Sequence, residues 1–199
     1  MGIDAGLKTF ATFSNGEEIE NPRFFRKEEK ALAKVNRKHS KLVKGSPERR
    51  KHRKVVARVH ERIKFRRDNF THQQSRQIVD RFGLICVEDL HVNCMVHNHC
   101  LAKSIHDAAW TGFFDKLFAK AEEAGRTAVK VNPAYTSQDC SRDPVWGTGN
   151  HHRQIMPLSE RTYHCPCCLL SIDRDLNASL NILSIGRYAL GLAREAPAF

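Results

Sequence analysis

One short segment, residues 165–183 (CPCCLLSIDRDLNASLNIL), combines two kinds of metal-binding chemistry. Cys165 and Cys168 form a CxxC pair, and paired thiolates on a tight turn are the ligands that tetrahedral zinc prefers. Asp173 and Asp175 follow directly, and hard cations such as Mg²⁺ bind carboxylate oxygens. An apolar helical pattern starts at Leu176. The segment therefore makes a nuclease the first hypothesis.

Two more carboxylates lie where apolar elements end. Asp4 follows the first strand-like residues in GIDAG, and Glu88 ends the apolar run of residues 84–87. Taken singly, such acids are usually helix caps or solvated groups. Together with Asp175, they are expected to meet at one edge of an α/β sheet. Two cations held there would bind the attacking water and the leaving oxygen of a phosphodiester.

Positive charge is concentrated in one part of the chain. The 199 residues carry a net charge of +11, and residues 23–67 hold 19 Lys and Arg against 4 Asp and Glu. The rest of the chain has more acidic than basic residues. This excess is too one-sided for salt-bridged pairing and predicts a phosphate-binding surface. The residues assigned to it are Arg49, Arg50, Lys51, Arg53, Lys54, Arg58 and Arg62.

The first half of the chain has clear element signals. Residues 1–20 read as strands with a hairpin at Asn15-Gly16. A basic helix is expected over residues 24–43. The run Gly45-Ser46-Pro47-Glu48 then provides a helix stop, an N-cap and a proline at the first helical position. The second helix should extend to about residue 81, so two antiparallel basic helices are predicted.

The second half of the chain predicts a strand, a helix, a strand and a final helix. The strands are expected at residues 84–90 and 127–131, and the last helix at residues 177–192. Residues 91–103 read as a polar loop, and Ser104 or Asp107 should cap the helix between the strands. Residues 134–170 show no periodicity. This order of elements predicts an α/β fold with an antiparallel portion early in its sheet.

Composition narrows the class of protein further. No apolar stretch approaches eighteen residues in length and no signal-peptide pattern opens the chain, so we expect a cytoplasmic protein without membrane contact. Seven cysteines, an odd number, favour metal ligation or burial over a disulfide scaffold.

The motifs GIDAG, VEDL, LAKSIHDAAW, NPAYTSQDCS and DRDLNASLNIL occur in family order. The chain resembles the RuvC-like nuclease and zinc-ribbon portion of TnpB (OrfB) proteins of insertion-sequence transposons, which are relatives of compact type V CRISPR effectors. The resemblance covers essentially all residues. It implies an RNase H-like (RuvC-like) core over residues 1–133 and 171–199, a basic helical hairpin inserted at residues 24–81, and a zinc-ribbon insert at residues 134–170.

The resemblance also implies RNA-guided cleavage of DNA that depends on Mg²⁺ or Mn²⁺. The catalytic acids of the family fall on Asp4, Glu88 and Asp175, and each would be a cation ligand. Asp173 is the competing assignment for the third acid. DNA and, in full-length members, a guide RNA are the implied partners.

The zinc ribbon departs from the family pattern. Cys140, Cys165 and Cys168 are kept, but Asp143 stands where a fourth cysteine belongs. Asp143, His151 or His152 is a candidate fourth ligand. Zinc binding and a degraded ribbon with weak or no zinc both stay open.

Two other groupings have ordinary explanations. The cluster of cysteines and histidines at residues 94–100 falls in a connecting loop of the family. Ser104, His106 and Asp107 stand together at an expected helix start, where capping explains them.

Family members have an N-terminal half that holds the guide RNA and reads the target-adjacent motif. We therefore expect this chain to be a truncated or decaying copy. The alternative function is a catalytically inactive DNA- or RNA-binding remnant. A zinc-ribbon interaction protein without nucleic acid is a third reading.

Overall fold

The computed structural model describes residues 1–142, 153–157 and 159–192. The chain forms two compact units, each of them built from separate stretches of sequence. The first comprises Met1–Asn21, Val79–His91 and Phe118–Phe199, and the second comprises Pro22–Ile78 and Val92–Leu117.

A five-stranded mixed sheet is the centre of the first unit. Its strands are β1 (Gly2–Asp4), β2 (Thr9–Phe13), β3 (Glu18–Glu20), β4 (Leu84–Glu88) and β5 (Thr127–Val131), in the order β3-β2-β1-β4-β5. Strands β1, β2 and β3 pair antiparallel, whereas β4 pairs parallel with both β1 and β5. The predicted α/β sheet with an early antiparallel portion is therefore confirmed. Gly16 takes the left-handed conformation (φ 85°) between β2 and β3, where Asn15-Gly16 predicted a hairpin.

Helix α6 (Arg174–Ala189) packs against this sheet at very short range. A Cβ added at Gly2 would meet the backbone of Ser179 and Leu183, and one added at Gly186 would meet the side chain of Cys86. The two glycines thus permit the close approach. This packing places the first turn of α6, which carries Asp175, close enough to Asp4 for the charge of Asp175 to act on it.

A small antiparallel sheet adjoins α6 in the same unit. It consists of β6 (Thr162–His164) and β7 (Ser171–Asp173). Its apolar cluster is Cys140, Met156, Tyr163, Cys165 and Leu170. This cluster is separate from the one between α6 and the main sheet, which contains Cys86, Val131 and Ile182.

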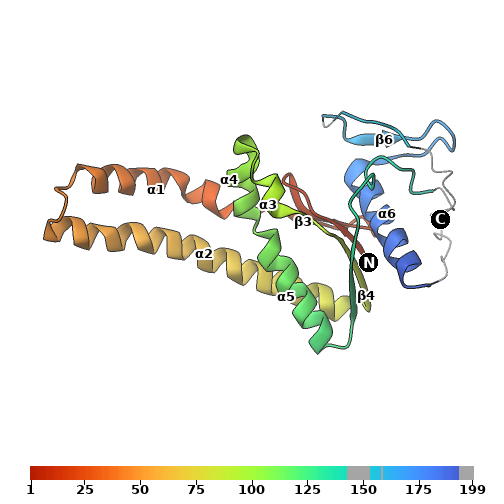
Figure 1. Ribbon diagram of the computed structural model, residues 1–199, viewed down its shortest axis with the longest axis horizontal. Helices are drawn as coiled ribbons and strands as arrows, with labels where there is room; N and C mark the ends of the chain where they lie inside the picture. The colour runs from red at the N-terminus through yellow and green to blue at the C-terminus, as the bar shows by residue number, and fades with distance from the viewer. Residues whose placement is uncertain (143–152, 158, 193–199) are drawn as a thin grey trace. The chain divides into compact units, whose positions relative to one another are not determined.

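The second unit is helical. Helix α1 (Phe24–Lys41) runs antiparallel to the first part of α2 (Pro47–Arg81), and Leu32, Val59 and Ile63 are buried between them (Figure 1). The predicted pair of basic helices is confirmed. The unit also contains α3 (Val92–Met95), α4 (His99–Ala108) and the first residues of α5 (Trp110–Glu123).

The structure corrects three local predictions. Residues 91–103 are not simply a polar loop, because they include α3 and the start of α4, which Asn98 caps by accepting from the backbone N–H of Cys100. Asp107 lies near the end of α4 and accepts instead from the backbone N–H of Phe25 at the start of α1. The expected single helix is broken at Ala109, which has a φ of 55°.

Helix α6 begins at Arg174, three residues earlier than predicted. Asp173 caps it by accepting from the backbone N–H groups of Asp175 and Leu176. None of the helices that the structure describes combines the length and apolar character needed to cross a bilayer.

Candidate functional site

Strand register brings Asp4 and Glu88 together. Gly2 pairs with Cys86 and Ile3 with Val87 in the parallel β1–β4 ladder, so the next residues in the two strands are neighbours at one edge of the sheet. Asp175, in the first turn of α6, faces the same place. Burial raises the pKa of Asp4 well above its usual range, and repulsion from Glu88 and Asp175 raises it further.

Glu88 belongs to the same negatively charged group. Only 8% of Glu88 is exposed to solvent. Burial raises the pKa of Glu88, a hydrogen bond from Thr136 opposes that rise, and Asp175 adds to it. Carboxylates that repel one another in a partly buried site are stabilised by bound cations. A donor set made only of oxygen fits Mg²⁺ or Mn²⁺.

Asp173 and Asp175 have different surroundings despite their closeness in sequence. Asp173 is exposed, and one of its carboxylate oxygens accepts from the backbone N–H groups of Asp175 (2.8 Å) and Leu176 (3.1 Å). Asp175 is half-buried and lies 3.6 Å from the guanidinium of Arg161. The geometry thus makes Asp173 a helix cap, and Asp175 adds more than Asp173 does to the raised pKa of Asp4.

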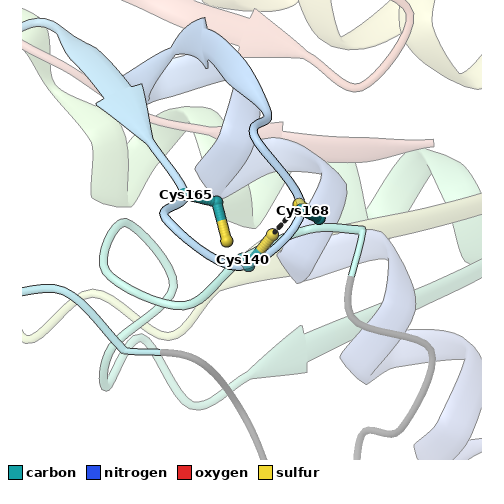
Figure 2. A group of neighbouring side chains, drawn as sticks. All are labelled: Cys140, Cys165 and Cys168. Carbon is teal, nitrogen blue, oxygen red and sulfur yellow. Dashed lines mark hydrogen bonds between the residues drawn. The ribbon is translucent and has the colours of Figure 1, made fainter.

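Three cysteines form the second candidate metal centre (Figure 2). The Sγ atoms of Cys140, Cys165 and Cys168 all lie within 4.8 Å of one another, and those of Cys140 and Cys168 are 3.5 Å apart. Zinc bonds thiolate sulfur at about 2.3 Å, so these three atoms fit three corners of its tetrahedron. Among the described residues, no other group of His, Cys, Asp and Glu side chains gathers this tightly.

The thiols of this triad differ in their surroundings. Burial raises the pKa of Cys140 to about 12. Burial also opposes ionisation of Cys165, but backbone N–H groups of Cys168 and Cys167 lower its pKa overall. Cys167 is exposed and outside the triad. The candidate fourth ligands Asp143, His151 and His152 lie outside the described residues.

The other groupings do not form sites in the described part of the chain. Cys94 and Cys100 are exposed and belong to no metal-like cluster there. The Asp107 carboxylate is buried, accepts from the backbone N–H of Phe25 and pairs with Arg67 at 3.0 Å. Its role is structural.

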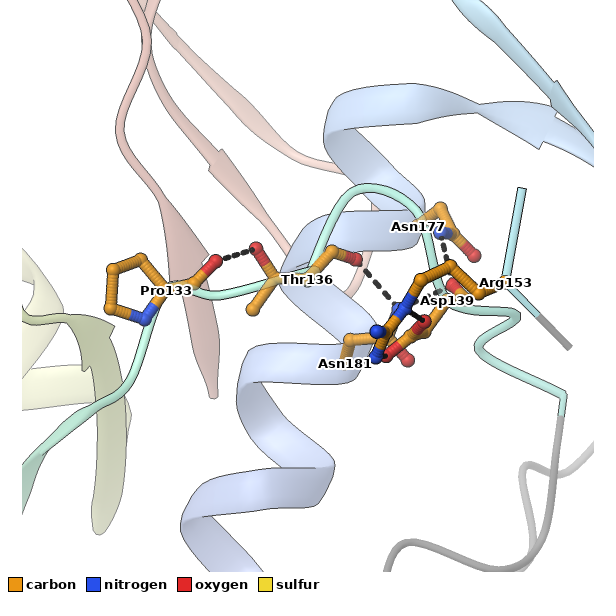
Figure 3. A network of polar contacts seen from close by, with 6 residues as sticks. All are labelled: Pro133, Thr136, Asp139, Arg153, Asn177 and Asn181. Atoms are coloured by element: carbon orange, nitrogen blue, oxygen red, sulfur yellow. Dashed lines mark hydrogen bonds and ion pairs between the residues drawn. The ribbon is translucent and has the colours of Figure 1, made fainter. Parts of the chain in front are cut away.

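Sequence reasoning missed a set of polar residues at positions 136–139 and on α6 (Figure 3). Thr136, Asp139, Asn177 and Asn181 are all buried and hydrogen-bonded within the first unit. The motifs TSQDCS and DRDLNASLNIL contain these residues. Apolar periodicity does not single them out, but amides spaced four residues apart on one helix face were a usable signal.

Most of the predicted phosphate-binding residues are on the solvent-facing side of α2. Arg50, Lys51, Arg53, Lys54, Arg58 and Arg62 are exposed. Arg49 differs, because its guanidinium donates to the backbone carbonyl of Leu42 at 2.7 Å, just past the end of α1. A cation is favourable at a helix C-terminus, so Arg49 has a structural role.

Family models match most of the chain. Residues 1–99 match the OrfB model of IS605 elements, described as "Probable transposase", and residues 110–182 match the "Cas12f1-like, TNB domain" model.

Several curated relatives are similar over nearly the whole chain. A Streptomyces pristinaespiralis protein named as an RNA-guided DNA endonuclease is 39% identical over 94% of this chain and 45% of its own length. InsQ of Escherichia coli strain K12, named likewise, is 29% identical over 96% of this chain and 50% of its own. The Sulfoacidibacillus thermotolerans CRISPR-associated endodeoxyribonuclease Cas12f1 is 31% identical over 92% of this chain and 44% of its own. The chain thus spans about half the length of these relatives.

Two solved structures share the fold at 20% sequence identity. A Cas12f1–sgRNA–target DNA complex superposes with a TM-score of 0.60, covering 91% of this chain and 48% of that one. A CRISPR-Cas12f ternary complex gives a TM-score of 0.64, covering 91% of this chain and 37% of that one.

Proposed function

Because the chain belongs to the TnpB/OrfB family of transposon proteins, we propose that it carries the nuclease centre of an RNA-guided DNA endonuclease. The observation that carries this proposal is that Asp4 and Glu88 end neighbouring parallel strands close to Asp175, where burial, and then the charges of Glu88 and Asp175, raise the pKa of Asp4. The core is then RNase H-like and comprises residues 1–133 and 171–199. Residues 24–81 are the basic insert and residues 134–170 the ribbon insert.

In this proposal the three acids hold Mg²⁺ or Mn²⁺. When bound, such cations lower the pKa of water and stabilise a leaving oxygen, which is the chemistry that phosphodiester hydrolysis needs. The protein would determine where the cations lie, because its strands and α6 fix the positions of the three acids. Neighbouring parallel strands fix the spacing of Asp4 and Glu88, and α6 adds Asp175 from a separate part of the chain. Asp173 holds the first turn of α6 in place.

The exposed basic face of α2 would bind nucleic-acid backbone. Lys and Arg side chains there face solvent with few acidic neighbours, and such charges bind phosphates regardless of base sequence. DNA and a guide RNA are the proposed partners, supported by the names of the relatives and by the complexes that share the fold.

Zinc at the cysteine triad would be structural. Cys140, Cys165 and Cys168 supply three ligands, and Asp143, His151 or His152 is the proposed source of the fourth. The site would join the segment before β6 to the β6–β7 turn.

The test is cleavage of labelled DNA by the purified chain with Mn²⁺ or Mg²⁺. Glu88→Gln and Asp4→Ala should remove cleavage. Asp89→Asn is the matched control, because Asp89 is the next residue along, is half-exposed and pairs with Lys130 at 3.5 Å. If wild type cuts no better than Asp4→Ala, the enzyme proposal fails. Salt-dependent binding without cleavage would then favour the inactive nucleic-acid-binding remnant.

A further inference from the structure

Glu88 has a buried hydrogen-bond partner outside its own strand. The hydroxyl of Thr136 lies 2.8 Å from Oε1 of Glu88 and 3.1 Å from the backbone carbonyl of Pro133. Thr136 is 3% exposed. The carboxylate and the Pro133 carbonyl both only accept, and a charged carboxylate at the shorter distance is the stronger acceptor, so the hydroxyl donates to Glu88 when that side chain is charged. The hydroxyl therefore restricts where Oε1 can lie.

The segment that carries Thr136 also carries a cysteine of the triad. Residues 133–140, here called the linking segment, follow β5 and end at Cys140. Figure 3 shows Pro133, Thr136 and Asp139 of this segment. Nδ2 of Asn181 donates to the carbonyls of Thr136 and Asp139, both at 2.7 Å. Nδ2 of Asn177 donates to the same Asp139 carbonyl at 2.8 Å. Both amides come from α6, the helix whose first turn holds Asp175.

Further contacts restrain the linking segment from outside. The Asp139 carboxylate accepts from Nε and Nη2 of Arg153 at 2.7 and 3.1 Å, and this guanidinium lies 3.4 Å from the centre of the Tyr135 ring. Tyr135 has a φ of 67°, which costs free energy for a residue with a side chain. Such a conformation persists only where surrounding contacts hold it in place. The linking segment therefore has a fixed conformation.

We propose that Thr136 is a positioning residue for Glu88, and that the linking segment couples metal binding at the cysteine triad to cation binding at the three acids. The coupling rests on the proposed function above. Zinc would fix Cys140 at one end of the segment, and Thr136, four residues before Cys140, would pass that restraint to Glu88. Partners that orient a metal ligand commonly change metal affinity by about 10–100-fold.

The first test compares Mn²⁺ dissociation constants, measured by electron paramagnetic resonance, for variants of the whole chain. Thr136→Val keeps the shape and removes the hydroxyl, and it should weaken Mn²⁺ binding by about 10-fold or more. Thr136→Ser should restore the affinity. Thr71→Val is the matched control, because Thr71 is also buried and its hydroxyl donates to the backbone carbonyl of Asp68 at 2.9 Å. It should lose stability without a change in Mn²⁺ affinity.

The Asp4→Ala variant distinguishes failure of the proposed acid site from failure of the positioning role of Thr136. If it binds Mn²⁺ as wild type does, the proposed acid site is wrong. If it loses Mn²⁺ while folded Thr136→Val binds normally, only the positioning role is overturned.

The second test removes the cysteine site instead of the hydroxyl. Cys168→Ser should weaken Mn²⁺ binding in the wild-type background, and Cys167→Ser should not. Because coupling between two sites runs through a shared element, Cys168→Ser should have little further effect once Thr136 is Val. Circular dichroism checks that each variant is folded. Fully additive losses in the double variant would overturn the coupling.

Discussion

At the scale of single residues, surroundings divide the acids near the site into two roles. Asp173 is exposed and satisfies backbone N–H groups at the start of α6, whereas Asp175 is half-buried and adds more than Asp173 does to the repulsion that raises the pKa of the buried Asp4. A spacing of two residues could not reveal this, because either acid fits the start of a helix.

Exchanging each of these two acids for asparagine should separate the roles. Asparagine also caps helices well, so Asp173→Asn should keep both stability and cleavage. Asp175→Asn should reduce cleavage by about 100-fold or more, because a cation ligand is lost. Single-turnover cleavage and thermal unfolding of both variants would check this. Loss of cleavage in Asp173→Asn alone would reverse the assignment.

The buried acids also predict how stability depends on pH without divalent cations. The folded protein binds protons at Asp4 and Glu88 more tightly than the unfolded chain does, since both pKa values are raised. Their contribution to the free energy of unfolding is therefore full below the unfolded pKa, about 4, and is lost as pH rises through the raised values.

The Asp4→Asn variant should flatten this dependence. Its Tm should exceed that of wild type at neutral pH, and the difference should shrink towards pH 4. Thermal scans across this range, in buffer without divalent cations, would check it. Adding Mn²⁺ should stabilise wild type more than the variant. Parallel Tm curves at all pH values would contradict the buried-acid geometry.

At the scale of elements, Asp107 holds three helices of the second unit together. From α4 its carboxylate accepts from the backbone N–H at the start of α1 and pairs with Arg67 of α2. An anion at a helix N-terminus is favourable, and here it is also buried.

Removing this carboxylate should be costly. Asp107→Ala leaves Arg67 and the start of α1 without a partner, and we expect a loss of about 2–4 kcal/mol in the free energy of unfolding. Urea denaturation would measure it. Lys116→Ala is the control, because its partner Asp68 is half-exposed and the loss should stay within about 1 kcal/mol. Equal losses would mean that burial at Asp107 contributes little.

The cysteine triad gives a second prediction at this scale. Wild type should bind about one zinc ion per chain, and Cys168→Ser should lose it. Cys167→Ser should retain it, since the neighbouring exposed thiol lies outside the triad. Elemental analysis of the purified proteins would decide. Zinc-free wild type, after reconstitution under reducing conditions, would favour the degraded ribbon.

Elements were predictable where local chemistry was strong. The Asn15-Gly16 hairpin, the Gly45–Pro47 helix boundary and the periodic helices were all visible in sequence. The break at Ala109 was not, because alanine favours helix and only tertiary packing imposes its positive φ. The partner of Asp107 was equally hidden, since it lies 82 residues away.

At the scale of the whole molecule, the two compact units differ in the charge that they carry. The basic excess lies in the helical unit, whereas the three acids lie in the sheet-containing unit. The buried polar network of Thr136, Asp139, Asn177 and Asn181 was not predicted from the sequence. The spacing of Asn177 and Asn181 marks one helix face, but the partners of their buried hydrogen bonds depend on which distant segments meet.

Neutralising the basic face should weaken binding to nucleic acid of any sequence. Replacing Arg50, Lys51, Arg53 and Lys54 with glutamine should reduce the slope of log affinity against log salt by about 0.9 for each duplex phosphate that the protein no longer neutralises. Fluorescence anisotropy at several salt concentrations would measure this. Lys130→Gln, in the sheet-containing unit, serves as the control. An unchanged slope would show that phosphates bind elsewhere.

The close packing of α6 on β1, which Gly2 allows, has a consequence for the order of synthesis. A ribosome makes the strand with Asp4 long before the helix start with Asp175. Until that helix has emerged, β1 lacks the partner that covers it and the set of acids is incomplete. A protein whose proposed activity is to cut DNA would thus gain its cutting centre only when translation of this region has finished. Synthesis interrupted before α6 would release a fragment that lacks Asp175, one of the three proposed cation ligands.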